Sequence, residues 1–141
     1  MHQRDYLLRL IEQIGGVLAE LRRRILGRRT SPSQVNQELA AVAGQTGLDI
    51  ELLRGFSAET LHMFVSPSGE VEPARCWLMA EVLYLDALQA HLEDRKEEAK
   101  DGFAKARMLF TLIEPGGGML VGLAEAADRV REIDDLIAEV D

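Results

Sequence analysis

The segment that most constrains the fold is residues 74–92, because a helix built from it is apolar on nearly every side. A helix of this kind, in a chain that remains in water, has to lie at the centre of the molecule where other elements cover it. We therefore expect residues 74–92 to form a central helix. Its apolar members are Cys76, Trp77, Leu78, Met79, Val82, Leu83, Tyr84, Leu85 and Leu88.

A stripe of apolar residues predicts a second long helix at residues 4–26. Its members lie alternately four and three residues apart, a spacing that places them on one face of a helix. Leu8, Leu10 and Val17 widen this face, as expected of a helix that packs against several others. Gly15 and Gly16 interrupt it, and a kink or a close backbone crossing would explain them. The stripe consists of Leu7, Ile11, Ile14, Leu18, Leu21 and Ile25.

Capping signals and helical spacing locate the other helices. Ser31, followed by proline, begins a helix that ends near Gly44 or Gly47. Asp49 and Ser57 are the expected N-caps of two short helices. No segment shows the alternation of a strand, so the prediction is an all-α bundle of about six or seven helices. The remaining expected helices cover residues 49–54, 57–64, 96–113 and 119–140.

Length and composition indicate one soluble helical domain at residues 1–141. A turn cluster at residues 66–69, followed by Pro73, marks a possible boundary between subdomains at 1–66 and 74–141. Cys76 is the only cysteine, so no disulfide can form within the chain. No run of 18 apolar residues and no signal peptide is present. A cytoplasmic location is the expectation.

Charge is distributed unevenly along the chain. The net charge is −8, yet residues 1–29 hold seven arginines against three acidic residues. The acidic remainder disfavours nucleic acid as a partner, since phosphate contacts need a positive surface. Contact of the Arg22–Arg24 and Arg28–Arg29 group with anionic lipid or nucleic acid is a weaker alternative. The favoured interpretation is that this group compensates the helix dipole, is solvated, or pairs with acidic residues near the end of the chain, in the same chain or in another subunit. These acidic residues are Asp134, Asp135, Glu139 and Asp141.

Residues 94–106 resemble the second helix of a tetratricopeptide repeat. Ala99, Phe103 and Ala106 follow its small–aromatic–small order at spacings of four and three. With the preceding helix the resemblance covers about residues 74–115, and it implies one helical hairpin rather than an array. A peptide-binding solenoid needs about three repeats. Residues 5–13 are similar to the start of a small uncharacterised bacterial family, which implies no activity.

Residues capable of chemistry are few and scattered. Glu59 and His62 share one helix face, but a di-iron bundle needs two such pairs and two further glutamates. His2, His91 and Cys76 lack the paired spacing of zinc ligands. Residues 116–118 form a glycine run that lacks the lysine and the strand of a phosphate-binding loop. We expect no catalytic residue, no metal, no cofactor and no enzymatic activity.

Two aromatic residues of the central segment, Trp77 and Tyr84, lie two helical turns apart on one face. Such a stripe can line a ligand pocket, but packing in the core is the more common role. Cys76 is expected to be a small buried apolar residue rather than a nucleophile.

The expected function is a non-catalytic module for binding a partner protein or for self-association. Homodimerisation is the specific hypothesis, because a two-fold dimer could pair the basic and acidic ends reciprocally. The alternative is a bundle that binds a small apolar ligand, which a closed apolar cavity of about 300 Å³ or more would favour. The candidate interaction surface comprises Leu7, Ile11, Ile14, Leu18, Leu21, Arg22, Arg23 and Arg24.

Overall fold

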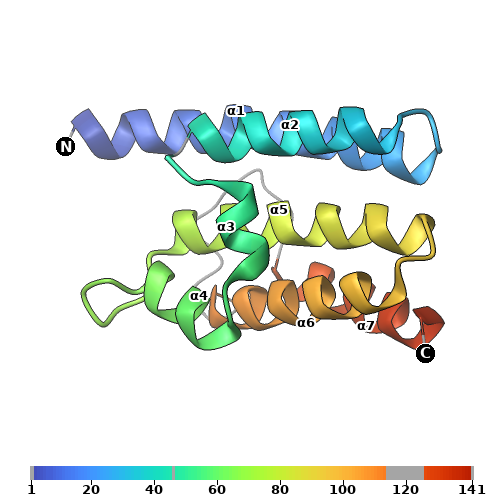
Figure 1. Ribbon diagram of the computed structural model, residues 1–141. Coiled ribbons are helices and arrows are strands. Elements are labelled where there is room, and N and C mark those ends of the chain that lie inside the picture. The colour runs from blue at the N-terminus through green and yellow to red at the C-terminus, as the bar shows by residue number, and fades with distance from the viewer. Residues whose placement is uncertain (1, 46, 114–125, 141) are drawn as a thin grey trace.

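The computed structural model describes residues 2–45, 47–113 and 126–140, with side chains described from residue 9 to 140 except 46 and 114–126. All regular structure in these residues is helical, which confirms the all-α prediction. The chain order is followed most easily in Figure 1. The helices are α1 (His2–Leu26), α2 (Pro32–Gln45), α3 (Ile50–Gly55), α4 (Ala58–Val65), α5 (Pro73–Leu92), α6 (Lys96–Ile113) and α7 (Ala126–Val140).

The predicted N-caps are present. The Ser31 hydroxyl accepts a hydrogen bond from the Gln34 backbone N–H at 3.1 Å, just before α2 begins. The Asp49 carboxylate accepts from the Glu51 N–H at 2.9 Å, and the Ser57 hydroxyl accepts from the Thr60 N–H at 3.1 Å. Each bond satisfies a backbone donor that the first helical turn leaves unpaired. Short polar side chains therefore fix where α2, α3 and α4 start.

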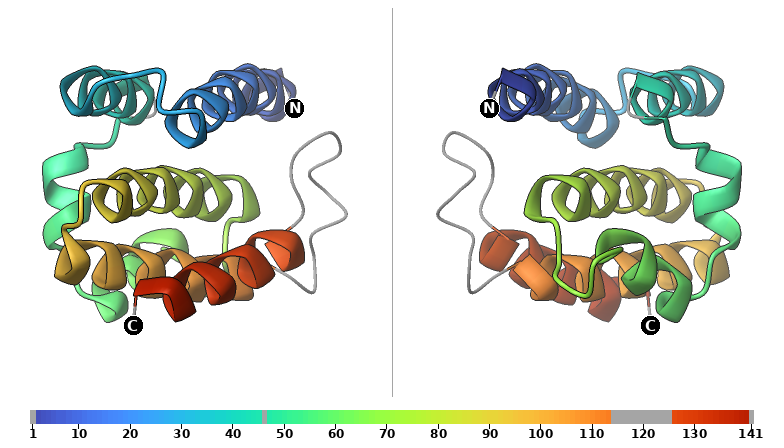
Figure 2. Two further views of the ribbon diagram at one scale, coloured as in Figure 1. Left: turned by 90° about the vertical axis from the view of Figure 1, so that its right-hand side faces the viewer. Right: turned by 90° about the vertical axis from the view of Figure 1, so that its left-hand side faces the viewer.

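The helices form three layers with α5 in the middle. Helices α1 and α2 lie side by side above α5, while α6 and α7 lie below it (Figure 2). Helix α5 packs against α1, α2, α4, α6 and α7. This central position follows from its composition, because most of its residues have no polar face to offer to water.

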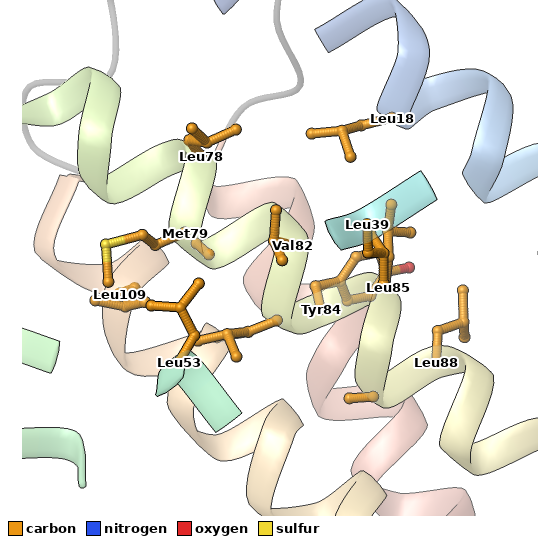
Figure 3. Close-up of a cluster of buried hydrophobic side chains, with 14 of the residues drawn as sticks. Leu18, Leu39, Leu53, Leu78, Met79, Val82, Tyr84, Leu85, Leu88 and Leu109 are labelled. Carbon is orange, nitrogen blue, oxygen red and sulfur yellow. The ribbon is translucent and has the colours of Figure 1, made fainter. Parts of the chain in front are cut away.

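The buried apolar side chains form one cluster that includes residues from α1 to α7. Leu18 of α1 and Leu39 of α2 point toward α5 from one side, and Leu109 of α6 lies near Met79 on the other (Figure 3). Trp77 and Tyr84 are both buried, which confirms their expected place in the core.

Helices α5 and α6 make the most extensive contact in the bundle. Their backbones come very close where Gly102 of α6 faces Ala87 of α5. A Cβ atom added at Gly102 would lie 2.8 Å from the Ala87 Cβ and 3.5 Å from the Leu83 carbonyl oxygen. Glycine is therefore needed at this crossing because no side chain fits between the two helices.

One detail differs from the sequence predictions, and part of another falls on residues that are not described. Helix α1 runs without interruption from His2 to Leu26, and a Cβ at Gly16 would meet no other atom within 4 Å. Close backbone crossing is therefore not the reason for Gly16. Helix α7 is described from Ala126. Residues 119–125 of the predicted helix, and the glycine run at 116–118, lie outside the described residues.

Candidate functional site

The predicted interaction stripe on α1 faces the interior of its own chain. Ile11, Ile14, Leu18 and Leu21 are each 4% exposed or less and belong to the core. The side chain of Leu7 lies outside the described residues. Helix α1 packs on α5 and α2 of the same chain, so the stripe is an intramolecular interface and not an exposed surface, which corrects that part of the prediction.

The three arginines of the predicted surface are already engaged in ion pairs. Arg22 pairs with Glu132 of α7, and Arg23 pairs with Glu20 one turn earlier. The Arg24 guanidinium donates a 3.0 Å hydrogen bond to Glu38 of α2. Two of the three pairs join α1 to other helices, and their side chains are only about one-quarter exposed. The basic end of α1 is thus paired with acidic groups of α7 and α2 in the same chain.

The residues considered for catalysis or metal binding do not converge. Glu59 and His62 are exposed on α4. The Cys76 thiol is buried and donates to the Leu109 carbonyl oxygen, and burial raises its pKa to about 12. His91 lies fifteen residues further along α5, about 22 Å away at 1.5 Å per residue. Among the described residues no group of histidine, cysteine and acidic side chains could hold a metal ion.

One candidate site on the described surface is an open groove, which we call the α1–α5 groove. It lies between the first half of α1, the end of α2 and the start of α5, and its volume is about 580 Å³. Apolar side chains from α1, from α5 and from the loops that follow α2 and precede α5 form its floor. They are Leu10, Ile11, Leu48, Val71, Pro73, Ala74 and Leu78.

Charged and polar side chains form the rim of the α1–α5 groove. Two carboxylates, Glu70 and Glu72, face one guanidinium, Arg75, and Gln45 and Ser68 complete the rim. The Arg75 Nε lies 3.4 Å from a Glu72 carboxylate oxygen, so these two charges offset each other. The Glu70 carboxylate is exposed, and the rim carries a net negative charge.

A second group of functional interest is a buried ion-pair network that joins α1, α5 and α7. Glu81 of α5 is 3% exposed, and it accepts a 2.7 Å hydrogen bond from Arg129 of α7. Arg129 also donates to Glu132 at 3.2 Å and lies over the Tyr84 ring. Glu132 in turn accepts from both Tyr84 and Arg22. Every charge in the network therefore has an opposite charge within hydrogen-bond distance.

The pKa values of the two acidic groups of the network, Glu81 and Glu132, are shifted in opposite directions. Burial raises the pKa of the Glu81 carboxyl above its usual value, although Arg129 opposes the shift. Burial would also raise the pKa of Glu132, but hydrogen bonds from Tyr84 and Arg22 outweigh it and lower the pKa. Burial raises the pKa of the Tyr84 phenol, so this group stays protonated and donates its hydrogen bond.

The sequence analysis did not identify the groove. Of the network it expected only that arginines at the end of the first helix pair with acidic residues near the end of the chain, as Arg22 does with Glu132, and it did not identify Glu81 or Arg129. One signal for the network was available, because Glu81 is a lone carboxylate in an otherwise apolar stretch and a buried charge needs a partner. The groove had no comparable signal, since it is made by three segments that are distant in sequence. Two smaller hollows, of about 270 and 360 Å³, share Arg54, Asp86 and Glu98, and Arg54 already pairs with Asp86.

Comparison of the chain with protein-family models, with curated proteins and with solved structures gives no match. None of the helices described here combines the length and the apolar composition needed to cross a membrane. The geometry of the groove and of the network is therefore the basis for the functional argument.

Proposed function

We propose that this protein is a non-catalytic binding module and that its α1–α5 groove takes an amphipathic segment of a partner protein. The observation that carries the proposal is the groove itself, about 580 Å³ of open space above an apolar floor. Contact between water and such a floor is unfavourable. Binding of apolar side chains there stabilises the complex by roughly 25 cal/mol for each Å² of apolar surface removed from water.

The openness of the groove favours a protein segment over a small molecule. Sites for small ligands usually enclose 70–90% of the ligand surface. The α1–α5 groove lies open between helices, which suits an amphipathic helix that inserts one apolar face and leaves the other in water. Because the volume also lies within the range of small-ligand sites, an apolar small molecule is the second candidate occupant.

Charge indicates what should flank the apolar anchors of the partner. The rim has two carboxylates and one guanidinium, and the whole chain carries a net charge of −8. Lysine or arginine beside the anchors would therefore be attracted, whereas acidic flanks would be repelled. The proposed partner is a segment with apolar anchors and basic flanks.

Two further features belong to the proposal. The single buried cysteine supports a cytoplasmic location. Ala99, Phe103 and Ala106 are fully buried in the α5–α6 hairpin, and this supports its interpretation as one divergent tetratricopeptide-like pair. Binding of a second copy of the chain is a competing outcome of the test below, and it is disfavoured because Arg22 and Arg24 are already paired within the chain.

Binding of designed peptides tests the proposal. Two fluorescent amphipathic peptides would carry the same leucine and phenylalanine anchors, one flanked by lysine and the other by glutamate. We expect the lysine-flanked peptide to bind about three- to tenfold more tightly at low salt, with the difference decreasing as salt is added. Methyl NMR of the complex should show the largest shifts at groove residues such as Leu10, Leu48 and Val71.

One variant and one matched control make the test specific. Ala74→Gln places a longer uncharged side chain on the groove floor and should weaken peptide binding at least tenfold. Ala58→Gln makes the same change in the first turn of α4, at an exposed position outside the groove, and should have no effect. The proposal fails if neither peptide binds, if Ala74→Gln binds as the parent does, or if only a neutral apolar dye or a second copy of the chain occupies the groove.

A further inference from the structure

Exposed apolar side chains gather on α4, beside the α1–α5 groove. Met63 and Phe64 are neighbours in this short helix, and they are 70% and 38% exposed. The ring of Phe56, just after α3, is half-buried and lies 5.7 Å from the Phe64 ring. Single exposed apolar residues are normal at a protein surface, but a group of aromatic and methionine side chains is typical of an interface. We call Phe56, Met63 and Phe64 the α4 ledge.

Two contacts attach the α4 ledge to the rim of the α1–α5 groove. Arg75 belongs to the rim, and its guanidinium carbon lies over the Phe64 ring at 6.0 Å from the centroid. The backbone N–H of Glu72, another rim residue, donates to the Val65 carbonyl oxygen at 2.7 Å. The end of α4 is thereby fixed beside the start of α5 (Figure 1). Arg75 is therefore shared by the groove rim and the border of the ledge.

We propose that the partner segment of the α1–α5 groove continues past Arg75 and places a second apolar side chain on the α4 ledge. This inference rests on the proposed function, because an exposed ring and an exposed thioether give one side chain too little contact to bind alone. Once the groove holds the first anchors, the second reaches the ledge at a high effective concentration. The aliphatic stem of Arg75 can pack against the segment while its charge stays in water.

The chemistry of the ledge defines the second anchor. Leucine, methionine or phenylalanine would pack against an aromatic ring and a thioether. One turn of a helical segment advances about 5.4 Å, which is less than the 6.0 Å between the Arg75 guanidinium carbon and the Phe64 centroid. Two turns, or seven residues, are therefore needed to carry the anchor past Arg75. The exposed carboxylates of Glu59 and Glu70 adjoin the ledge in sequence, so the basic flanks selected by the groove also suit it.

Two peptides of equal length test the inference on the full chain. Both are lysine-flanked amphipathic helices with the same groove anchors, and seven residues further on one has leucine and the other serine. We expect the leucine peptide to bind about five- to tenfold more tightly. The Met63 methyl resonance should shift with the leucine peptide and stay unchanged with the serine peptide.

Variants of the ledge locate the advantage of the leucine peptide. Phe64→Gln should remove it, and Met63→Gln, at a more exposed position, should reduce it at least threefold. Neither change should alter the affinity of the serine peptide. Leu26→Gln is the matched control, because Leu26 is 48% exposed and lies fifteen residues after Ile11 of the groove, about 22 Å along α1. It should leave both affinities unchanged.

The serine peptide reports on the groove alone and separates the two proposals. Equal binding of the two peptides, or a Met63 methyl that stays unmoved by the leucine peptide, would overturn the inference and leave the proposed function standing. Failure of both peptides to bind would refute both. A Met63 resonance that shifts with protein concentration in the absence of peptide would place a second copy of the chain on the ledge, and this would also overturn the inference.

Discussion

The crossing of α5 and α6 gives the sharpest test of how this bundle is packed. In Gly102→Ala, the new Cβ would lie 2.8 Å from the Ala87 Cβ, well inside van der Waals contact. The Ala87 Cβ is attached directly to a helix backbone, so it cannot turn aside as the end of a long side chain could. One of the two most extensively packed helices has to move.

The size of the effect follows from two opposing terms. Forcing an extra methyl group into a packed core costs roughly 1–3 kcal/mol. Replacing glycine by alanine inside a helix contributes about 1 kcal/mol of stability, which partly offsets that cost. Gly102→Ala should therefore lower the free energy of unfolding by up to about 2 kcal/mol.

Gly16→Ala supplies the matched control because it makes the same change inside α1 at a position with no atom within 4 Å. The helix-forming term is common to both variants, so the difference in their stabilities isolates the packing cost. We expect Gly16→Ala to be more stable than Gly102→Ala by about 1–3 kcal/mol in urea unfolding followed by circular dichroism.

A third variant checks that Ala87 is the obstacle. Ala87→Gly combined with Gly102→Ala moves the glycine from α6 to α5. The new Cβ at position 102 then has no contact shorter than 3.5 Å. The double variant should unfold within about 1 kcal/mol of the parent. Equal stabilisation by Gly16→Ala and Gly102→Ala would refute the close crossing, as would a double variant no more stable than Gly102→Ala.

Three further predictions use the same unfolding assay or a simple labelling experiment. Asp94 has a left-handed backbone with φ of 62°, so Asp94→Gly should stabilise the protein by about 0.5–1 kcal/mol, and a loss would contradict the strain. Ser57→Ala removes the cap of α4 and should cost about 1 kcal/mol, whereas Ser68→Ala in an exposed loop should cost little. Cys76 should react with iodoacetamide at pH 8 about a thousandfold more slowly than an ordinary thiol, because its pKa of about 12 keeps it protonated and burial blocks access. Rapid labelling of the folded chain would show instead that the thiol is exposed.

The sequence predicted the parts of the fold that are decided locally. Ser31, Asp49 and Ser57 cap their own helices, so short-range chemistry was sufficient to place α2, α3 and α4. The burial of residues 74–92 followed from composition alone, because a helix with no polar face has one possible environment in water.

The site could not be predicted in the same way, because it depends on how helices are rotated and spaced. Leu10 of α1, Leu48 of the loop after α2 and Ala74 of α5 meet in one groove although they are distant in the sequence. No local pattern fixes the distance between α1 and α5 at that end of the bundle. The partner of Glu81 was equally hidden, because Arg129 lies 48 residues away in the chain.

The stripe on α1 shows why periodicity does not identify a binding surface. An apolar face needs cover, but its spacing is the same whether α5 of the same chain or another molecule provides it. Here the charges distinguish the two cases. Arg22 reaches a carboxylate 110 residues away on α7, and Arg24 reaches one on α2, so the basic end of α1 matches acidic groups of its own chain. Carboxylates of the same chain therefore already neutralise Arg22 and Arg24. An approaching partner therefore meets an acidic body, and for this reason the groove should select basic flanks rather than acidic ones.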